Sequence, residues 1–536
     1  MAGLPLRALL AAMLVLAGGV PAYAAAVRPG PTLEAAARSD ARLGEIYAAR
    51  GFTPLWQGNA DADTRRTVAL ALLAREQRFA PAGVPAEKLA RAVSGRPDPE
   101  AELALSRAFL GYLERRGGGR PVRATAATHV LDGLAAAHST SDLDLALEEL
   151  KIVDALGGWT PVRMRAPASV VIPPLTPVTP ELEQVPPPNE RPRSQPDVPE
   201  LRRRLVQSLD LAAQYAGGEK LDGPVAQAVR RFQARHGLVP DGVVGFKTAA
   251  LLNESVTGQI GRVELNMARN LAANIVSGRA GFRRYVEVNV PSFELRLMED
   301  GRVTYRSRVI VGDEDKPTPV FDDWMRYIDL NPSWYVPRSI EQEILDKEAK
   351  EPGYMSKAGF VWQPAGAGAP ARLIQRPGPE NALGRLKFVF PNRNSVYIHD
   401  TPNRGLFNRS DRTLSHGCIR LEQPLGLAAA LLRAQGWDQG RLDAALQEPK
   451  THRVHLDSPV PVFLDYRTAT LDAEGRLLLW PDVYGYDEEG VTRFPMKGLP
   501  PEQELAPPQP EATPAAPETV AVRQVTPPTP APVAGL

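Results

Sequence analysis

A proline-rich stretch most constrains how this chain of 536 residues can fold. Twelve of the 53 prolines lie between Pro161 and Pro199. Proline fixes its own backbone torsion and lacks the N–H donor that helices and sheets need, so this stretch is expected to be extended and semi-rigid. The chain is also too long for one hydrophobic core. The sequence therefore predicts several domains, with residues 161–199 as a linker or insertion.

The two ends of the chain are expected to lie outside the folded domains. Residues 1–24 combine a positive Arg7, an apolar run from Ala8 to Val20 and the small-x-small site Ala22-Tyr23-Ala24, as in a secretory signal peptide. The run is shorter than the roughly 20 residues of a membrane-spanning helix. Residues 499–536 are rich in Pro, Ala and Glu and are predicted to be a disordered tail.

Charge and cysteine content narrow the function classes. Lys and Arg number 63 and Asp and Glu 62, so no overall charge favours nucleic acid or an anionic membrane as a partner. Cys418 is the only cysteine. In an exported protein a single thiol cannot form an internal disulfide, and an unpaired cysteine there indicates a reactive one.

Helical spacing of apolar residues dominates residues 25–160, for example over 102–113 and 142–156, and predicts an all-helical domain. His129 and His138 stand alone in this region and are interpreted as structural or solvated. No cluster of titratable residues in this domain suggests chemistry.

Residues 200–255 are predicted to form a small helical module. Pro224 suits the first turn of a helix, and Val225, Val229 and Phe232 are spaced to form one buried stripe. The pattern predicts a compact three-helix unit.

Residues 256–498 are predicted to form a β-rich domain, because segments such as 285–290 and 294–298 alternate with period two. Between 339 and 383 the strand pattern breaks, which indicates an insertion into the sheet. Its aromatic residues would supply apolar surface that a merely solvated loop does not need. They are Tyr354, Phe360 and Trp362.

The strongest candidate for chemistry is the cluster of Cys418 with His416 two residues before it and His399 further upstream. A cysteine attacks as the thiolate, and a nearby imidazole can take the thiol proton. Gly417 permits a tight turn whose N–H groups could face a developing oxyanion. On spacing alone, two other interpretations stay open: a buried, inert cysteine, and a zinc site with His399, His416 and Cys418 as ligands.

The segment from His399 to Arg420 resembles the signature of the L,D-transpeptidase catalytic (YkuD) domain. His399 is followed after fifteen residues by Ser415-His416-Gly417-Cys418-Ile419-Arg420, with every signature position present. Residues 228–248 similarly resemble the type 1 peptidoglycan-binding domain, and residues 46–56 are similar to the scaffold of large YcbB-type L,D-transpeptidases. The fold that this resemblance implies is multidomain α+β: a helical scaffold, a three-helix peptidoglycan-binding module and a YkuD-like β-sandwich whose 339–383 insertion is a mobile lid.

The resemblance also implies roles for the site residues. Cys418 would be the nucleophile and His399 its general base, oriented by an acceptor on Asp400, either its side chain or its backbone carbonyl. The backbone N–H groups of His416, Gly417 and Cys418 would supply the oxyanion hole. Substrate contacts are expected from three further side chains, which are Arg420, Ser415 and Tyr397.

The implied reaction is cross-linking of peptidoglycan. Cys418 would attack a tetrapeptide stem, release D-alanine and pass the acyl group to a second stem, giving a 3→3 cross-link in the periplasm without metal or cofactor. Donor and acceptor stems are the expected partners, with other wall-synthesis proteins as further candidates, and carbapenems are expected to acylate the thiol. Two rival functions remain: a zinc-dependent wall hydrolase that uses the His399, His416 and Cys418 set, and a non-catalytic wall-binding protein that relies on residues 200–255.

Overall fold

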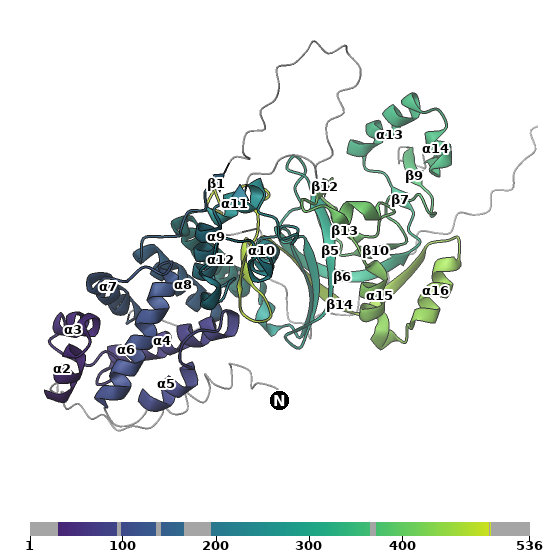
Figure 1. The fold of residues 1–536 in the computed structure, drawn as a ribbon. Helices are drawn as coiled ribbons and strands as arrows, with labels where there is room; N and C mark the ends of the chain where they lie inside the picture. Colours follow the sequence, from purple (N-terminus) through teal and green to yellow (C-terminus); the bar gives the residue numbers. More distant parts are fainter. Residues whose placement is uncertain are drawn as a thin grey trace, which may run out of the picture. The chain divides into compact units, whose positions relative to one another are not determined.

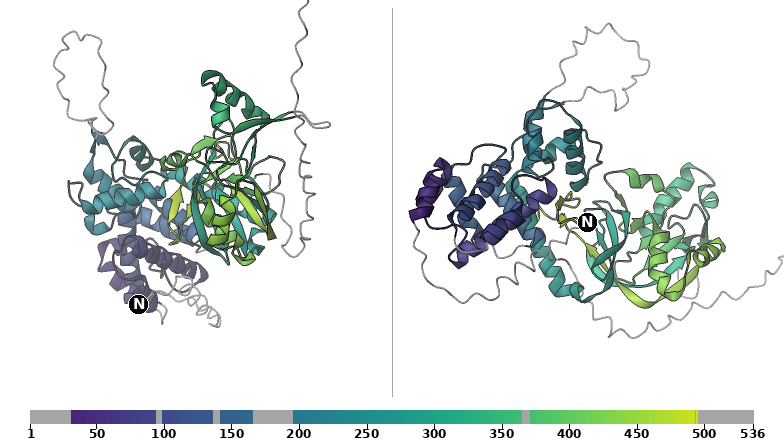
Figure 2. Two further views of the ribbon diagram at one scale, coloured as in Figure 1. Left: turned by 90° about the vertical axis from the view of Figure 1, so that its right-hand side faces the viewer. Right: turned by 60° about the horizontal axis from the view of Figure 1, so that its bottom comes forward.

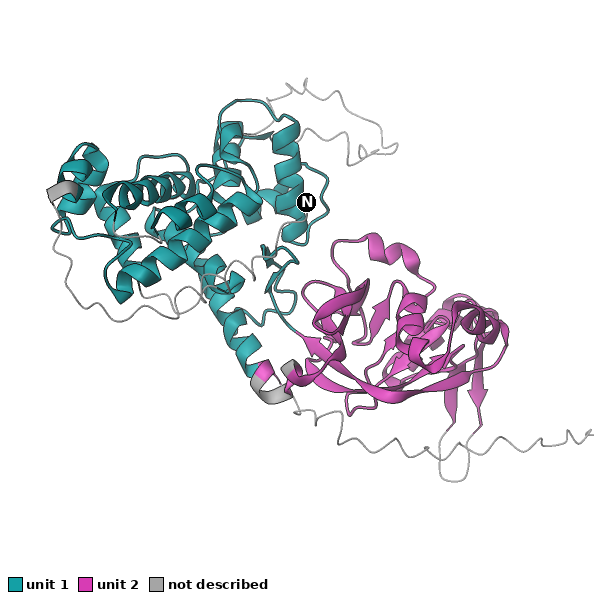
Figure 3. Cartoon of the chain, turned by 90° about the horizontal axis from the view of Figure 1, so that it is seen from below, with its two compact units in different colours: residues 1–272, 466–493 teal, residues 273–465, 494–536 magenta. Residues whose placement is uncertain are grey.

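The computed structural model describes residues 31–93, 98–135, 141–165, 195–364, 371–492 and 494. They fall into two compact units: unit 1 lies within residues 1–272 and 466–493, and unit 2 within residues 273–465 and 494–536 (Figures 1 and 3). The predicted signal peptide, His138, most of the proline-rich stretch and the predicted tail lie outside the described residues.

Unit 1 is mainly helical, and polar caps explain where many of its helices begin. Asp40, Asn59, Ser141 and Asp222 each accept a hydrogen bond from a backbone N–H in the first turn of the helix that follows. The helices described in this unit are α2 (Pro31–Arg38), α3 (Ala41–Ala48), α4 (Ala60–Phe79), α5 (Ala86–Val93), α6 (Pro99–Arg116), α7 (Ala124–Leu134), α8 (Asp142–Ala155), α9 (Val198–Gln207), α10 (Gly223–Arg235), α11 (Phe246–Leu252) and α12 (Val256–Ser277), whose last residues pass into unit 2.

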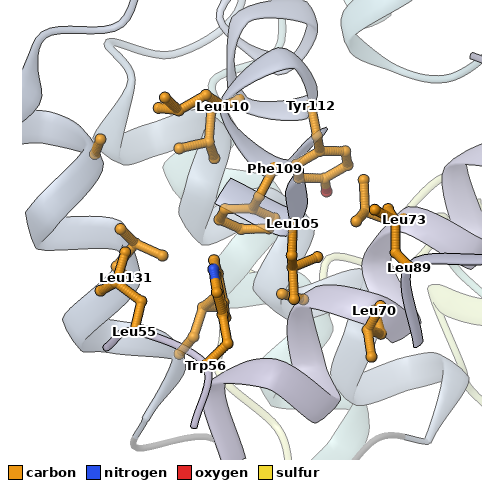
Figure 4. Close-up of a cluster of buried hydrophobic side chains, with 14 of the residues drawn as sticks. Leu55, Trp56, Leu70, Leu73, Leu89, Leu105, Phe109, Leu110, Tyr112 and Leu131 are labelled. Carbon is orange, nitrogen blue, oxygen red and sulfur yellow. The ribbon is translucent and has the colours of Figure 1, made fainter. Parts of the chain in front are cut away.

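The N-terminal helices share one aromatic-centred core (Figure 4). The Trp56 and Phe109 rings meet edge to face at 5.7 Å, and Phe109 stacks on Tyr112 at 5.5 Å. The Trp56 indole donates to Ser106 Oγ over 2.8 Å, so its polar edge is satisfied inside the core. This core accounts for the all-helical region that the sequence predicts.

Helices α9 to α11 form a second core in unit 1, and the predicted stripe of Val225, Val229 and Phe232 is buried in it. Met164 pairs with Pro196 in a short two-stranded ribbon of β1 (Met164–Arg165) and β2 (Gln195–Pro196). The two ends of the segment 166–194 are therefore held side by side. The described residues on both sides of this segment therefore belong to unit 1.

A hairpin from near the end of the described chain completes unit 1. Its strands are β15 (Ala469–Leu471) and β16 (Leu477–Leu479), and Ala469, Leu477 and Leu479 pack with apolar residues of α8 and α12. Residues 256–272 and 466–493, which the sequence assigns to the β-rich domain, therefore belong to unit 1. The boundaries of the two compact units therefore differ from those of the predicted domains.

Unit 2 is built on a sheet that closes on itself. Its strand order is β5-β13-β11-β10-β6-β14-β3-β4, and β4 pairs again with β5, while β12 runs beside one end of β5. Figure 2 shows the ribbon in two further views. The strands are β3 (Arg284–Asn289), β4 (Glu294–Glu299), β5 (Arg302–Gly312), β6 (Phe321–Leu330), β10 (Leu386–Val389), β11 (Ile398–His399), β12 (Thr413–Ser415), β13 (Ile419–Leu421) and β14 (His452–Asp465). Helices α15 (Pro424–Leu432) and α16 (Gln439–Gln447) follow β13.

The insertion after β6 has a small core of its own. It contains β7 (Trp334–Tyr335), α13 (Arg338–Lys350), α14 (Tyr354–Lys357), β8 (Phe360–Gln363) and β9 (Arg372–Gln375), with strand order β7-β9-β8. Phe360 is buried with Ile344 and Leu373, and Tyr354 packs against them. Trp362 is 47% exposed, so of the three predicted aromatic residues it is the one that presents substantial surface.

These observations confirm the predicted fold class: a helical N-terminal region, a small helical module and a β-rich domain, in a multidomain α+β chain. Throughout the part of the chain that the structure describes, none of the helices has both the length and the apolar character to cross a membrane.

Candidate active site

Four predicted site residues share one face of the closed sheet. Strands β11 and β13 run parallel, with Ile398 opposite Ile419 and His399 opposite Arg420. Side chains alternate between faces along a strand, so Tyr397 and His399 lie on the same face as Cys418 and Arg420. The ring centroids of Tyr397 and His399 are 5.6 Å apart.

His399 is held as a neutral imidazole with a defined tautomer. Its Nδ1 lies 2.6 Å from the backbone carbonyl oxygen of Asp400. Because a carbonyl only accepts, Nδ1 carries the proton and Nε2 keeps its lone pair. Burial, together with the nearby Arg420 guanidinium, lowers the pKa of His399 to about 3. The ring is therefore a proton acceptor over the whole neutral range.

The thiol of Cys418 is partly exposed and is surrounded by donors and cations. Its Sγ is 3.9 Å from the backbone carbonyl oxygen of Ser395. Burial raises the pKa of the Cys418 thiol, while hydrogen bonds from the Tyr397 backbone and side chain and the charges of Lys387 and Arg420 oppose that rise. At neutral pH the resting pair is thus a thiol and a neutral imidazole, and the surroundings are arranged to favour a transient thiolate.

The turn that carries Cys418 depends on glycine and on two hydroxyl groups. Gly417 has φ +103°, a region that residues with a Cβ rarely adopt. Ser415 Oγ donates to the Cys418 carbonyl over 2.6 Å and accepts from the Gly417 N–H at 3.2 Å. Thr318 Oγ1 donates to the Gly417 carbonyl over 2.9 Å. The Ser415 hydroxyl is therefore directed into the turn.

Two backbone donors of this turn remain free. The N–H of Gly417 is engaged with Ser415 Oγ, whereas the N–H groups of His416 and Cys418 have no acceptor among the described residues.

The His416 ring points toward the insertion. Its Nε2 is 3.1 Å from Oε1 of Glu343 on α13, and Lys316 Nζ is 3.5 Å from the same oxygen. The hydrogen bond from His416 is the main cause that lowers the pKa of Glu343. A second contact joins the insertion to the site, since the Trp334 side chain hydrogen-bonds the Tyr397 hydroxyl.

Of the two predicted acceptors on Asp400, the backbone carbonyl is the one that orients His399. The Asp400 carboxylate is buried and binds elsewhere: its Oδ2 accepts from the Arg385 N–H at 2.8 Å, and its Oδ1 accepts from the Thr401 N–H at 2.7 Å and from the Arg404 guanidinium.

Lys387 is a site residue that sequence reasoning missed. It lies in β10, opposite His399 of β11 and Asp329 of β6, and its Nζ is 3.9 Å from the centroid of the Tyr397 ring. Burial lowers the pKa of Lys387, and Asp329 opposes that change. The sequence did hold a signal for Lys387. Side chains alternate between the two faces of a strand, so Lys387 lies on the opposite face from the apolar Leu386 and Phe388.

Metal ligation was a rival interpretation of the motif. Within the described residues, no group of three or more His, Cys, Asp or Glu side chains is arranged to hold a metal ion. His399, His416 and Cys418 are accordingly not gathered as a three-ligand set, because the His416 side chain is directed to Glu343.

These features define a domain with one thiol beside a fixed neutral histidine, and comparison with known families gives its class. Residues 283–454 match the L,D-transpeptidase catalytic domain (YkuD), residues 194–252 match the family described as "Putative peptidoglycan binding domain", and residues 41–162 match the Scaffold domain. The chain therefore carries an L,D-transpeptidase catalytic domain together with a peptidoglycan-binding domain, as the motifs predict.

A curated relative supports the same family. A Haemophilus influenzae protein named "Putative L,D-transpeptidase" is 36% identical over 244 residues, which cover 42% of this chain and 50% of the relative. The chain thus spans about half the length of the curated relative that it matches.

Two solved structures were also matched. The first is described as "Structure of the Ldtfm-avibactam carbamoyl enzyme"; it is 13% identical, with 34% of this chain and 49% of that chain covered and a TM-score of 0.16. The second is an L,D-transpeptidase of Xylanimonas cellulosilytica, 18% identical, with 51% and 94% covered and a TM-score of 0.18.

Proposed function

We propose that this chain is a peptidoglycan L,D-transpeptidase in which Cys418 is the nucleophile and His399 the general base. One observation carries the proposal: the only thiol of the chain shares a sheet face with a buried histidine whose Nδ1 is fixed on the Asp400 carbonyl. That arrangement leaves Nε2 as a proton acceptor, which is what activation of a neutral thiol requires.

In the first half of the reaction, Sγ attacks the carbonyl between the L-centre and the D-residue of a tetrapeptide stem. His399 takes the thiol proton as the S–C bond forms. The backbone N–H groups of His416 and Cys418 receive the oxyanion. The C–N bond then breaks, the proton passes from His399 to the leaving amine, and D-alanine departs, which leaves a thioester on Cys418.

In the second half, an amine of another stem attacks the thioester. His399 accepts a proton from that amine, the C–S bond breaks, and the proton returns to the thiolate as the new amide forms. The product is a 3→3 cross-link. Neither half needs a metal ion or an organic cofactor.

Positively charged groups beside Cys418 suit a substrate that carries carboxylates. Arg420 makes no ion pair with any carboxylate of the described residues, so its guanidinium is available for a stem carboxylate. Lys387 adds a second positive charge on the same face. Ser415 and Thr318 hold the turn, and Tyr397 contacts the sulfur.

The other parts of the chain have proposed roles in the same process. The insertion over residues 339–383 acts as a lid, supported by the contact of its Glu343 with His416. The module within residues 200–255 binds peptidoglycan. A signal peptide over residues 1–24 would deliver the protein to the periplasm.

Mass spectrometry of the full chain with a disaccharide-tetrapeptide tests the function. The expected result is a covalent adduct equal to the donor minus D-alanine, on the peptide that contains Cys418, and a 3→3 dimer in solution. Cys418→Ala should fold normally by circular dichroism and give neither product. Activity that survives in folded Cys418→Ala would overturn the assignment of Cys418 as nucleophile. Activity that a chelator removes would favour a hydrolytic zinc site, and no turnover or adduct in the wild type would favour a wall-binding protein.

A further inference from the structure

Unit 1 contains a pocket that the proposed chemistry does not use. Its cavity volume is about 40 Å³, which is room for a compact group of a few heavy atoms. Its wall comes from the scaffold helices α4, α6 and α8, from the module helices α9 and α10, from α12 and from the β16 strand. Residues far apart in the sequence therefore converge on one small pocket.

Cations dominate the wall of this cavity. Five arginines line it against a single acidic residue, Glu149. The arginines are Arg75, Arg116, Arg204, Arg235 and Arg476.

Most of these arginines have a carboxylate beside them. Arg75 lies 3.1 Å from Glu149 and 3.2 Å from Asp142, and Arg235 holds Asp210 through two hydrogen bonds of 2.9 and 2.6 Å. These pairs neutralise their charges locally.

Arg204 differs from the others because no carboxylate of the described residues lies within ion-pair distance of it. Its Nε donates to the Leu252 carbonyl over 2.8 Å, and its guanidinium carbon is 3.9 Å from the centroid of the Trp159 ring. The side chain is only 1% exposed. Burial lowers the pKa of Arg204 to about 9. A buried cation without a counter-charge is costly, and an anion in the adjoining cavity would remove that cost.

Several cavity-lining side chains also have buried nitrogen atoms without a hydrogen-bond partner in the described part of the chain. Such atoms are Nη1 of Arg204, Nε of Arg116, Nε of Arg476 and Nε2 of Gln259. Buried donors are normally satisfied, so a group of them around one space points to a ligand with several acceptor oxygens.

One lining side chain adds an acceptor. His236 Nδ1 is 2.7 Å from the Phe232 carbonyl, which places the proton on Nδ1. Its Nε2, also without a partner among the described residues, therefore presents a lone pair. A ligand that carries both acceptor oxygens and one O–H group matches this set.

We propose that this cavity binds a phosphate group that retains a proton, either as inorganic phosphate or as the phosphomonoester of a small molecule. The arginine and glutamine donors hold the phosphoryl oxygens, and the lone pair of His236 accepts from the phosphate O–H. Sulfate offers the same oxygens but no proton at neutral pH. This inference concerns unit 1 alone and does not rest on the proposed function.

Thermal unfolding and calorimetric titration of the full chain test the site. Inorganic phosphate should raise the midpoint of unfolding in a saturable manner, whereas KCl of equal ionic strength should not. Arg204→Met should weaken phosphate binding by about ten- to a hundredfold, as expected for the loss of a hydrogen bond to a charged group. Arg163→Met is the matched control, because that side chain is 79% exposed in the same unit and should leave binding unchanged.

A second variant tests the same site in case Arg204→Met does not fold. The Arg476 side chain is 29% exposed, so Arg476→Gln disturbs the core little and should also weaken phosphate binding. Stabilisation that is no greater than that of KCl, or that persists equally in Arg204→Met and Arg476→Gln, would overturn the proposal. Equal binding of sulfate would contradict the part assigned to His236. Glucosamine 6-phosphate identifies the source: tighter binding than inorganic phosphate supports a phosphomonoester, and weaker binding supports the free anion.

Discussion

The Nδ1 atom of His399 donates to the backbone carbonyl of Asp400 over 2.6 Å, and this contact determines how the candidate base can act. The carbonyl cannot be protonated or lost by substitution of a side chain. It leaves Nε2 free while the buried ring stays neutral, with a pKa of about 3. The base is therefore ready at every pH at which the protein is expected to work.

The rate of Cys418 acylation should be nearly independent of pH between 5 and 8. Over that range His399 is neutral, because its pKa is about 3, and Cys418 is a thiol, because burial raises its pKa. Transfer of the thiol proton to His399 then involves no net proton exchange with solvent. The measurement is the rate of carbapenem adduct formation by mass spectrometry. An acylation rate that changes with pH about a midpoint near 6.5, the usual pKa of histidine, would contradict a neutral His399 as the base.

His399→Gln should slow acylation at neutral pH by about 10²–10⁴, the usual size of a general-base effect. Without the base, only the small fraction of thiolate can react, so the residual rate should rise about tenfold per pH unit below the pKa of the thiol. His452→Gln is the control, since its ring binds Glu448 outside the site. The same carbapenem assay measures both variants. A flat pH profile in His399→Gln would show that another group takes the proton.

Sequence alone could predict the site motif and many elements, but not which neighbours the fold brings to it. Alternation predicted a β-rich domain over residues 256–498, yet the place of Lys387 beside His399 depends on strand order, which alternation does not encode. Similarly, spacing placed His416 next to Cys418. The direction of the His416 ring is decided by Glu343, on a helix 73 residues away in the sequence.

Gly417→Ala should reduce acylation while the protein stays folded. The backbone at Gly417 has φ +103°, and forcing a residue with a Cβ into such a region costs about 1–3 kcal/mol. Relief of that strain would move the N–H groups of His416 and Cys418, and loss of one oxyanion donor costs about 10²–10³ in rate. Gly405→Ala is the control, because an added Cβ there meets nothing within 4 Å. Equal carbapenem acylation rates in the two variants would argue against this role of the turn.

Glu343→Gln should loosen the insertion without destabilising the protein. Glu343 accepts from His416 at 3.1 Å, and such an exposed contact contributes only about 0–1 kcal/mol. Hydrogen exchange over residues 338–363 should therefore become faster, while the midpoint of thermal unfolding stays within about a degree or two. Asp346→Asn is the control, since Asp346 binds Gln342 on the same helix. Unchanged exchange in Glu343→Gln would mean that this contact does not hold the insertion to the turn.

Phe246→Ser should weaken binding to isolated peptidoglycan sacculi while leaving turnover of a small soluble stem peptide unchanged. Phe246 begins α11 and is 89% exposed, and Val239 and Val243 of the same module are also exposed. Such apolar surface on a module of this family is suited to contact with the wall polymer. Leu271→Ser is the matched control, because Leu271 is 62% exposed on α12, outside the residues that match the peptidoglycan-binding family. Co-sedimentation with sacculi measures the effect. An equal loss of binding in both variants would mean that general surface hydrophobicity, and not this module, determines retention on the wall.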